Sequence, residues 1–505
     1  MSRSAENARH LSIWYILGLA IFLRTLLPIS AYLYTRDATI FYTADSASYI
    51  VPARELVASH RFFSDGSPQA AVWNTPVVPA PDTVRTPGYP LLLTIGLLSG
   101  RLETVTIALQ ILLSCFTVYM VYRTAFLLFE SEQIALIAAA LYVVEPLSIL
   151  FSSLLSTETL FTATLMVALY YLVRYLKRQS LGDLLVSGGA LAACVYIRPA
   201  GYFVPVVVAA GLVAWALGTD QSNKLRLIAH LSAFVMVSIG LTSLWQIRNR
   251  VAIGYSGFSS VFSEDMYCCL AASVLAAKQR LPYTEMQNRL GCYDLGVYFK
   301  KHPDQKTWPV TQRFNYMYSV GVRILLSNPL TYARIYLEGV VRSIFDPGST
   351  EFIRLFDLYP KGGGLLNVAL DKGMIKTLET LLLSPLLAWS TLVLLVLQFI
   401  YLACACVAVS KQSIRDPAIV VALLIMGYYL AIPGGPAAWG RFRHPAMPIM
   451  CVVAGYGLSV AWDWLRSADS RFAYARISQV SPSFSTAMSF DECANQDETS
   501  RILNR

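Results

Sequence analysis

The first long polar segment of the chain opens with Ala44-Asp45-Ser46-Ala47-Ser48-Tyr49 and closes with Arg85-Thr86-Pro87-Gly88-Tyr89-Pro90. It follows one strongly apolar run and precedes a chain that is otherwise mostly apolar. An acid, Asp45, and a base, Arg85, each stand just before a short stretch of helical character. Because binding and catalytic residues concentrate on loops held by a rigid scaffold, we expect this segment to be the functional loop.

Composition indicates an integral membrane protein. The chain has 505 residues, of which 55% are hydrophobic and 14% are charged, whereas charge runs near 25% in soluble domains. Apolar runs recur along it, each close to the ~20 residues that cross a bilayer core. The formal net charge of +9 lies largely in short links between these runs, as the positive-inside bias requires. No basic patch is interleaved with aromatics, so nucleic acid is not an expected partner.

The apolar runs predict an all-α polytopic membrane protein with about ten to thirteen transmembrane helices. The upper figure allows for helices hidden in the long polar regions. Ten spans are placed directly, at about 11–33, 105–128, 133–151, 159–177, 184–197, 200–217, 226–246, 383–409, 417–432 and 446–464.

Short basic links fix the expected topology. The links 178–183, 218–225 and 410–416 carry lysine or arginine and are therefore assigned to the cytoplasm. This assignment puts residues 34–104 and 247–382 outside. The predicted organisation has four parts. Residues 1–246 form a transmembrane catalytic half that includes the first periplasmic loop, 34–104, and residues 247–382 form a larger periplasmic loop. Residues 383–465 form the C-terminal transmembrane helices, and residues 466–505 a disordered polar cytoplasmic tail.

Three helices that do not span are expected in the outer regions. Asp45 or Ser46 can cap a helix that runs to about Ser59. The apolar stretch Pro90–Ser99 is too short to cross at 1.5 Å per residue and should lie at the outer interface. Residues 328–345 have an amphipathic pattern and are predicted to form an interfacial helix.

Charged residues at the span ends gather on the outer side in this topology. They are Asp45, Arg85, Glu158, Arg198, Arg248, Arg250, Arg441 and Arg443. Charges near the hydrocarbon line a polar cavity or reach the headgroups, and an outer arginine cluster with two acids is typical of a site for a phosphate-bearing anion. For single residues other interpretations stay open: an arginine can snorkel to headgroups, Asp45 can cap its helix, and Glu158 can be a first-turn acid.

Cysteine spacing gives no metal site. Cys268, Cys269 and Cys292 share one outer region, where a disulfide to Cys292 would leave one thiol over. No pair has the spacing of zinc ligands. We expect no cofactor; a divalent metal is possible but not favoured.

The motifs together resemble a known family. They comprise Ala44-Asp45-Ser46 with Tyr49, Arg85-Thr86-Pro87-Gly88-Tyr89-Pro90-Leu91, Thr157-Glu158, Arg198-Pro199, Trp245 with Arg248-Asn249, and Arg441-Phe442-Arg443. In their order along the chain and in the side of the membrane to which they are assigned, these motifs are similar to those of the bacterial polyprenyl-phosphate glycosyltransferases of the GT-C fold. That group includes the protein O-mannosyltransferases and the lipid A aminoarabinose transferase. The likeness covers about residues 10–465.

The resemblance implies roles for individual residues. Asp45 would be the base that activates the acceptor, and Glu158 the second acid. The carrier phosphate would lie against Arg85, Arg248 and Arg441. Tyr49, Tyr89, Arg198 and Arg443 would line the substrate.

The function that this implies is inverting transfer of a sugar from a polyprenyl-phosphate donor to a protein, lipid or polysaccharide acceptor. The reaction would take place on the outer face of the cell inner (cytoplasmic) membrane. Two alternatives stay open: a lipid-linked sugar transporter or flippase, and a non-catalytic membrane subunit of cell-envelope glycan assembly. Against a transporter, the chain has no internal repeat and few charges within its spans.

Overall fold

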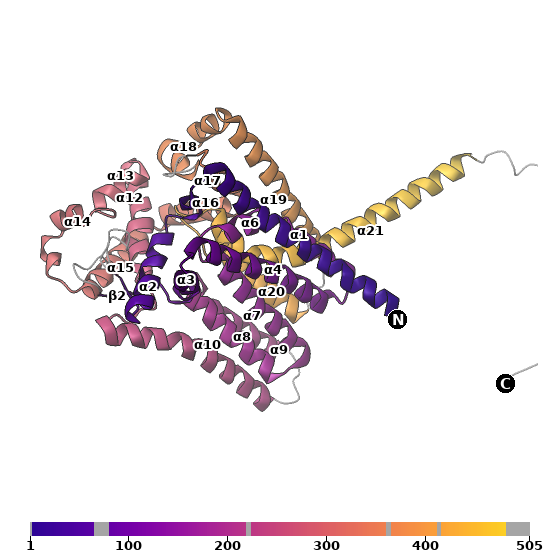
Figure 1. Ribbon diagram of the computed structural model, residues 1–505, viewed down its shortest axis with the longest axis horizontal. Helices are drawn as coiled ribbons and strands as arrows, with labels where there is room; N and C mark the ends of the chain where they lie inside the picture. The colour runs from indigo at the N-terminus through magenta and orange to yellow at the C-terminus, as the bar shows by residue number, and fades with distance from the viewer. Residues whose placement is uncertain (1–2, 65–79, 219–223, 360–364, 412–415, 481–505) are drawn as a thin grey trace, which may run out of the picture. The chain divides into compact units, whose positions relative to one another are not determined.

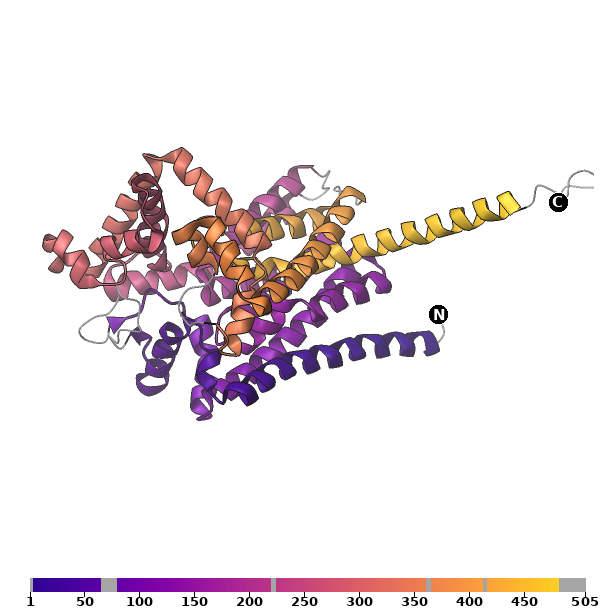
Figure 2. The ribbon, with the colours of Figure 1, turned by 90° about the horizontal axis from the view of Figure 1, so that it is seen from above.

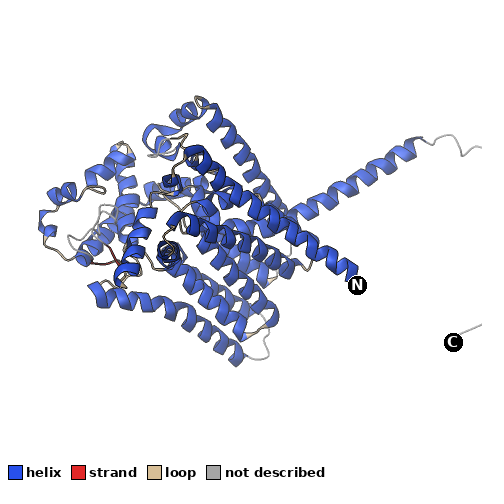
Figure 3. Ribbon diagram, viewed as in Figure 1, coloured by secondary structure: helices blue, strands red, loops and turns tan. Residues whose placement is uncertain are grey.

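A computed structural model describes residues 3–64, 80–218, 224–359, 365–411 and 416–480. The chain divides into two compact units, Met1–Ser459 and Val460–Arg505. The described residues are almost entirely helical, and their only strands are the two-residue pair β1 (Phe63–Ser64) and β2 (Ala80–Pro81), which is antiparallel (Figure 3). The all-α fold predicted from the sequence is confirmed.

The helices follow the apolar pattern of the sequence. In the first half they are α1 Arg3–Thr35, η1 Ala38–Phe41, α2 Ser46–Ser59, α3 Gly88–Leu98, α4 Leu102–Phe129, α5 Glu132–Val143, α6 Pro146–Ser153, α7 Glu158–Arg178, α8 Leu181–Ile197, η3 Pro199–Gly201, α9 Val204–Gly218 and α10 Lys224–Ile253. In the second half they are α11 Val261–Glu264, η4 Asp265–Ala271, α12 Ala272–Gln279, α13 Tyr283–Leu290, α14 Leu295–Lys301, η5 Pro303–Lys306, α15 Val310–Leu326, α16 Pro329–Phe345, α17 Ser349–Leu355, α18 Leu365–Leu382, α19 Pro385–Lys411, α20 Pro417–Ala431, η6 Gly440–Ala446 and α21 Met447–Val480.

Every span predicted from the sequence coincides with helical structure, but fewer helices than predicted are long enough to cross alone. Among the described residues, seven helices meet the length and composition of a membrane span, or eight if the bent pair α5–α6 counts as one. Two predicted spans, α8 and α20, are apolar but have only 17 and 15 residues. The predicted number of ten to thirteen transmembrane helices is therefore not reached when only helices long enough to span the membrane are counted.

The predicted span 133–151 is broken in the structure. The axes of α5 and α6 differ by 53°. Pro146 starts α6 and has no N–H to continue the preceding helix, while the Glu145 carboxylate accepts from the N–H of Leu147 (3.3 Å). The carbonyls released at the break accept from Arg24, whose Nη2 and Nη1 donate to Tyr142 O (3.2 Å) and Val143 O (3.1 Å). Arg24 is fully buried, so this intramembrane charge has a structural role.

The core of the first unit lies between the spans. Helices α4, α7, α8 and α10 pack successively side by side (Figure 1). Gly457 of α21 allows α19 to pack closely against it, because a Cβ at this position would lie 1.8 Å from Cys404 O of α19. This frame holds the polar segments between the spans.

The polar segments of the first unit gather at one end of these spans. Figures 1 and 2 both show α2 and the helices α12–α15 at this end. The predicted helices near 46–59, 90–99 and 328–345 are present as α2, α3 and α16.

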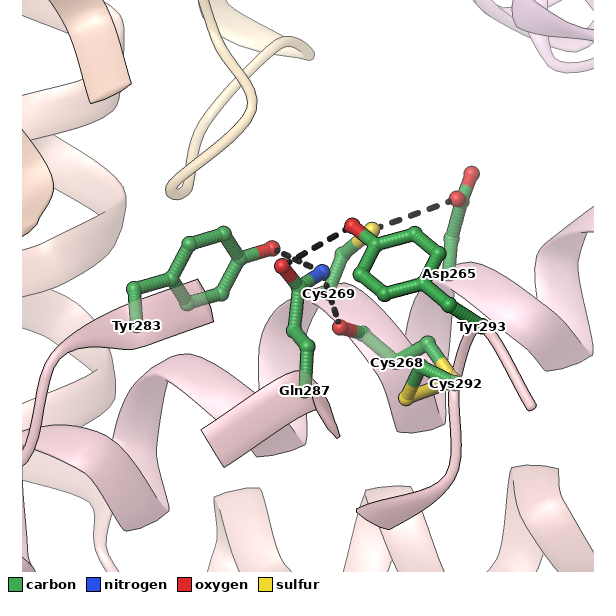
Figure 4. Close-up of a disulfide and its surroundings, with 7 residues drawn as sticks. All are labelled: Asp265, Cys268, Cys269, Tyr283, Gln287, Cys292 and Tyr293. Atoms are coloured by element: carbon green, nitrogen blue, oxygen red, sulfur yellow. Dashed lines mark hydrogen bonds between the residues drawn. A yellow bond between two sulfur atoms is a disulfide. The ribbon is translucent and has the colours of Figure 1, made fainter. Parts of the chain in front are cut away.

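A disulfide closes part of the second polar region. Cys268 and Cys292 are bonded, with a Cα–Cα distance of 5.6 Å, and Cys269 is left as a free thiol (Figure 4). Gln287 lies beside it and donates to Cys268 O (2.9 Å) and to the Tyr283 hydroxyl (3.0 Å). The sequence left open which of the three cysteines would keep a free thiol if a disulfide formed to Cys292. The disulfide joins Cys268 to Cys292, and the remaining thiol is that of Cys269.

The second unit begins within α21, which continues to Val480. Residues 466–480 of the predicted disordered tail are therefore helical. The rest of that tail, 481–505, lies outside the described residues.

Candidate functional site

Asp45 stands at the N-cap position of α2 but does not cap the helix. It makes no capping hydrogen bond, so the predicted capping role is wrong for this side chain. Ser46 does not take that role either, because its Oγ donates to Leu155 O (2.6 Å) and accepts from Thr43 N (2.8 Å). The Asp45 carboxylate is consequently available to other partners, and its side chain is 33% exposed.

Two guanidinium groups bind the Asp45 carboxylate from different parts of the chain. Arg85 Nη2 donates to Oδ1 (2.9 Å), and Arg441 Nη1 donates to Oδ2 (2.6 Å). Arg85 also donates to Ser48 Oγ (2.8 Å) and to the Tyr49 hydroxyl (3.2 Å), and it lies over the Tyr49 ring. Residues 45, 85 and 441 therefore meet in space, although long stretches of chain separate them.

Arg441 connects this pair to a second acid. Its Nε donates to Glu158 Oε1, which also accepts from Arg198 Nη1 (2.7 Å). Glu158 is fully buried, and the Arg198 guanidinium stacks on the Phe442 ring. The result is a continuous network, Arg85–Asp45–Arg441–Glu158–Arg198, which we call the charge network. Three guanidiniums face two carboxylates in it, with a formal excess of one positive charge.

Backbone pairing explains why the two acids lie close together. Leu155 N donates to Phe41 O (2.8 Å), and Tyr42 and Leu155 form an isolated parallel bridge. The segment that leads to Asp45 is thereby fixed alongside the segment that leads to Glu158 at the start of α7. Arg441 arrives on η6, just before α21.

Arg443 stabilises η6 and is not part of the charge network. Its Nη1 donates to Ser343 O (3.1 Å), Ile344 O (3.2 Å) and Asp346 O, at the end of α16. Asp346 in turn accepts from Gly440 N (2.9 Å) through Oδ2. The guanidinium is thus committed to backbone carbonyls that hold η6 in place.

The two tyrosines predicted to line the substrate occupy different positions. Tyr49 contacts Arg85 directly. Tyr89 is fully buried behind Tyr49, in an edge-to-face contact (5.3 Å between centroids), and its hydroxyl donates to Gln110 (2.9 Å). Tyr89 therefore supports Tyr49 from below.

Arg248 is not brought into the charge network. Its Nη1 donates to Asp82 O (2.7 Å) and its Nη2 to Phe62 O (2.8 Å). Asp82 is electrostatically close to both Arg248 and Arg85, so Arg248 lies behind the segment that carries Arg85. Sequence reasoning did not single out Asp82, because one acid in a polar loop gives no distinguishing signal.

The electrostatics of the network favour ionised groups. Burial alone would raise the pKa of the Asp45 carboxyl, but Arg85 and Arg441 outweigh it and hold this pKa below its usual value. For Arg85, burial would lower the pKa, but the neighbouring Tyr49 and Asp45 outweigh it and raise the pKa above normal. Asp45 and Arg85 therefore form an ion pair over the whole physiological pH range.

Two further acids near Arg85 were not anticipated. Burial raises the pKa of the Glu264 carboxyl to about 8, and neighbouring Asp265 adds to the rise. The pKa of Asp265 is raised to about 6 by desolvation, although its side chain reaches the surface. Glu264 Oε1 is buried and has no hydrogen-bond partner within the described part of the chain. Both acids lie at the junction of α11 and η4. This region of the sequence has many polar residues, so nothing in the sequence distinguished these two acids from the others.

The raised pKa of Glu264 predicts a pH-dependent stability. An unfolded glutamate titrates near 4.5, so between pH 4.5 and about 8 the folded protein retains a proton that the unfolded chain has released. The contribution of Glu264 to the free energy of unfolding therefore falls as pH rises through this window. We expect the Tm of Glu264→Gln to fall less, or rise more, between pH 5 and 8 than that of wild type, measured by thermal unfolding in detergent. Glu285→Gln, at an exposed carboxylate, is the matched control; equal slopes in wild type and Glu264→Gln would contradict the prediction.

The described residues contain no group of three or more His, Cys, Asp or Glu side chains placed to hold a metal ion. The charge network itself alternates cations and anions. That arrangement suits an anionic ligand that competes with the carboxylates for the arginines.

Comparison with known families and structures connects this geometry to one class of proteins. Residues 84–245 match the family model of the dolichyl-phosphate-mannose-protein mannosyltransferases. The matched segment includes Arg85, Glu158 and Arg198. A search of curated proteins found no significant match.

Solved structures align with most of this chain at low sequence identity. The archaeal oligosaccharyltransferase AglB from Archaeoglobus fulgidus, in complex with an inhibitory peptide and a dolichol-phosphate, aligns with a TM-score of 0.50 and 14% identity over 96% of this chain and 53% of its own. This chain thus spans about half the length of that enzyme. ArnT from Cupriavidus metallidurans, bound to undecaprenyl phosphate, aligns with a TM-score of 0.34 and 10% identity over 86% of this chain and 76% of its own.

The protein is a multi-pass helical membrane protein with a GT-C fold. Its resemblance to the polyprenyl-phosphate-dependent glycosyltransferases, inferred from the sequence motifs, is confirmed by the family match. The family whose model matches residues 84–245 is, by its description, one of mannosyltransferases.

Proposed function

We propose that the protein is an inverting glycosyltransferase that moves a sugar from a polyprenyl-phosphate carrier to an acceptor at the outer face of the cytoplasmic membrane. The observation that carries this proposal is the Asp45 carboxylate bridged by Arg85 and Arg441. A candidate base and two phosphate-binding groups are thereby joined at one point. The AglB complex, which contains a dolichol-phosphate, supports a lipid-linked donor for the same fold.

The charge balance of the network suits the donor. A polyprenyl-phosphate sugar is a phosphodiester with one negative charge, which matches the formal excess of one positive charge. On transfer the leaving group becomes a phosphate monoester and gains charge. Guanidiniums already oriented toward that phosphate stabilise the transition state more than the ground state, which is the electrostatic form of catalysis.

The ion pairs of Asp45 set the order of events. While Arg85 and Arg441 hold the carboxylate, its low pKa makes it a weak base. An arriving phosphate competes for the same guanidinium N–H groups and partly neutralises them. The Asp45 pKa then rises toward its ordinary value, and one carboxylate oxygen becomes free for the acceptor hydroxyl.

In the transfer step the acceptor oxygen attacks the anomeric carbon and Asp45 takes its proton. The new C–O bond forms as the bond from that carbon to the phosphate oxygen breaks, with inversion. The bonding pair leaves with the polyprenyl phosphate, so no general acid is required. Glu158 is the second carboxylate of the proposed site, where it holds Arg441 and Arg198 toward the phosphate.

The test uses purified protein in nanodiscs with a panel of labelled undecaprenyl-phosphate sugars and candidate acceptors. Saturable release of undecaprenyl phosphate together with a glycosylated acceptor is the expected result. Transfer of intact donor between leaflets of proteoliposomes without turnover would instead support a flippase. Failure to bind undecaprenyl phosphate would reject the proposed site and favour a non-catalytic subunit.

A further inference from the structure

Arg85 is carried by a short segment, residues 82–85, whose backbone is held from both sides. It follows directly on β2, and Asp82 N donates to Phe62 O (3.1 Å), the residue before β1. No regular helix or strand fixes these four residues. The placement of the Arg85 guanidinium against Asp45 therefore depends on side chains that hold this segment.

The Asp82 carboxylate organises the segment from within. Its Oδ1 accepts from Val84 N (2.8 Å) and Arg85 N (3.0 Å), and its Oδ2 accepts from Ser64 Oγ (3.0 Å). Asp82 is only 4% exposed. A buried carboxylate that accepts two successive backbone N–H groups forms an Asx-type turn, and this turn sets the direction in which the Arg85 side chain leaves the backbone.

Arg248 fastens the base of this turn to α10. Its two Nη atoms donate to the carbonyls of Phe62, which precedes β1, and Asp82, which follows β2. The guanidinium also lies over the Trp245 ring (4.7 Å) and near the Phe62 ring (5.7 Å). A planar fork with five donors suits two carbonyls at once, which a lysine ammonium does not.

The opposite side of the segment is held by the polypeptide that follows α10. Ser260 N donates to Thr83 O (2.9 Å), and Ser259 Oγ donates to Val84 O (2.6 Å). The carbonyls of residues 82, 83 and 84 all accept from the region 248–260. The segment is thus closed between α10 and the start of the second polar region.

We propose that Asp82 and Arg248 are positioning residues that form a clamp presenting Arg85 to the substrate phosphate. This inference rests on the proposed function for the identity of the ligand, but the clamp itself is independent of it. Arg248 then acts through Arg85 and not as a separate phosphate ligand, because both of its Nη atoms are engaged with backbone carbonyls.

The first test measures the clamp without any ligand. Hydrogen–deuterium exchange of peptides covering residues 82–86 is compared in wild type, Arg248→Gln, Asp82→Ala and Asp82→Asn. We expect exchange in this segment to accelerate at least about tenfold in Arg248→Gln and Asp82→Ala, while the membrane spans are unchanged. Asp82→Asn keeps an oxygen that can accept from Val84 and Arg85, so it should restore much of the protection. Arg250→Gln, on the exposed side of the same helix, is the matched control and should exchange as wild type does.

The second test separates positioning from direct binding. Affinity for undecaprenyl phosphate is measured in a double-mutant cycle of Arg85→Ala and Arg248→Gln. A clamp predicts that Arg248→Gln weakens binding about tenfold in the wild-type background and has little further effect once Arg85 is absent. Additive losses with unchanged exchange at 82–86 would overturn the proposal and make Arg248 a direct ligand. If wild type does not bind the probe, the proposed function fails, and the exchange experiment still decides the clamp.

Discussion

Replacing Asp45 by asparagine is expected to abolish sugar transfer while leaving the binding of polyprenyl phosphate intact. Asparagine has the same shape but cannot take a proton from the acceptor hydroxyl, and loss of a general base lowers rates by about 10²–10⁴. The same change removes one negative charge from the charge network and raises its formal excess of positive charge. Affinity for undecaprenyl phosphate should therefore be equal to or higher than that of wild type. Both quantities are measured on protein purified in nanodiscs.

The loss of sugar transfer together with unchanged or higher affinity for undecaprenyl phosphate distinguishes the loss of a base from a general loss of structure. A variant that merely misfolds would lose binding and turnover together. Glu55→Gln is the matched control: it removes a carboxylate from the same helix, α2, where the Glu55 side chain accepts from Ser59 Oγ (3.2 Å). It should leave both quantities unchanged. Turnover of Asp45→Asn at the wild-type rate would remove Asp45 from the role of base.

The helical frame could be predicted from sequence because hydropathy alone decides it. Runs such as 105–128 and 226–246 lie within α4 and α10, since apolar residues and a hydrogen-bonded backbone are both required in the hydrocarbon region. The break at Glu145-Pro146 was missed. An apolar run that continues past a single proline looks unbroken, and only the fold brings Arg24 to the carbonyls released there.

The members of the charge network could be found in the sequence, but their connections could not. Asp45, Glu158, Arg198 and Arg441 are notable because charges beside apolar runs are costly and must have partners. Which arginine pairs with which acid depends on the alignment of the segments before residues 45 and 158, and this follows from a backbone contact between Tyr42 and Leu155. Arg248 satisfies the same sequence criterion, yet its partners are the neighbouring Asn249 side chain and two backbone carbonyls, and backbone carbonyls have no sequence signature.

Replacing Arg441 by glutamine is expected to damage both stability and binding, for separable reasons. Arg441 joins Asp45 to the fully buried Glu158. Breaking a buried ion pair costs about 3–5 kcal/mol when the remaining charge has no other partner. Because Arg198 still pairs with Glu158, we expect a smaller loss of about 1–3 kcal/mol in unfolding free energy. Losing a charge-assisted bond to phosphate should also weaken undecaprenyl-phosphate binding by roughly 10–100-fold.

A second substitution separates these two effects. In the double variant Glu158→Gln/Arg441→Gln the acid that Arg441 could serve as counter-ion is removed as well. Arg198 then lacks its carboxylate partner, so the free energy of unfolding, measured by thermal unfolding in detergent, should be no higher than in Arg441→Gln. Binding should stay weak, because the guanidinium that meets the phosphate is still missing. If the double variant instead regains wild-type affinity, Arg441 acts only as a counter-ion for Glu158, and the phosphate would have to be held by Arg85 with Arg198. Arg441→Lys should fall between these limits, since a single ammonium keeps the charge but does not reproduce the fork that bridges two carboxylates.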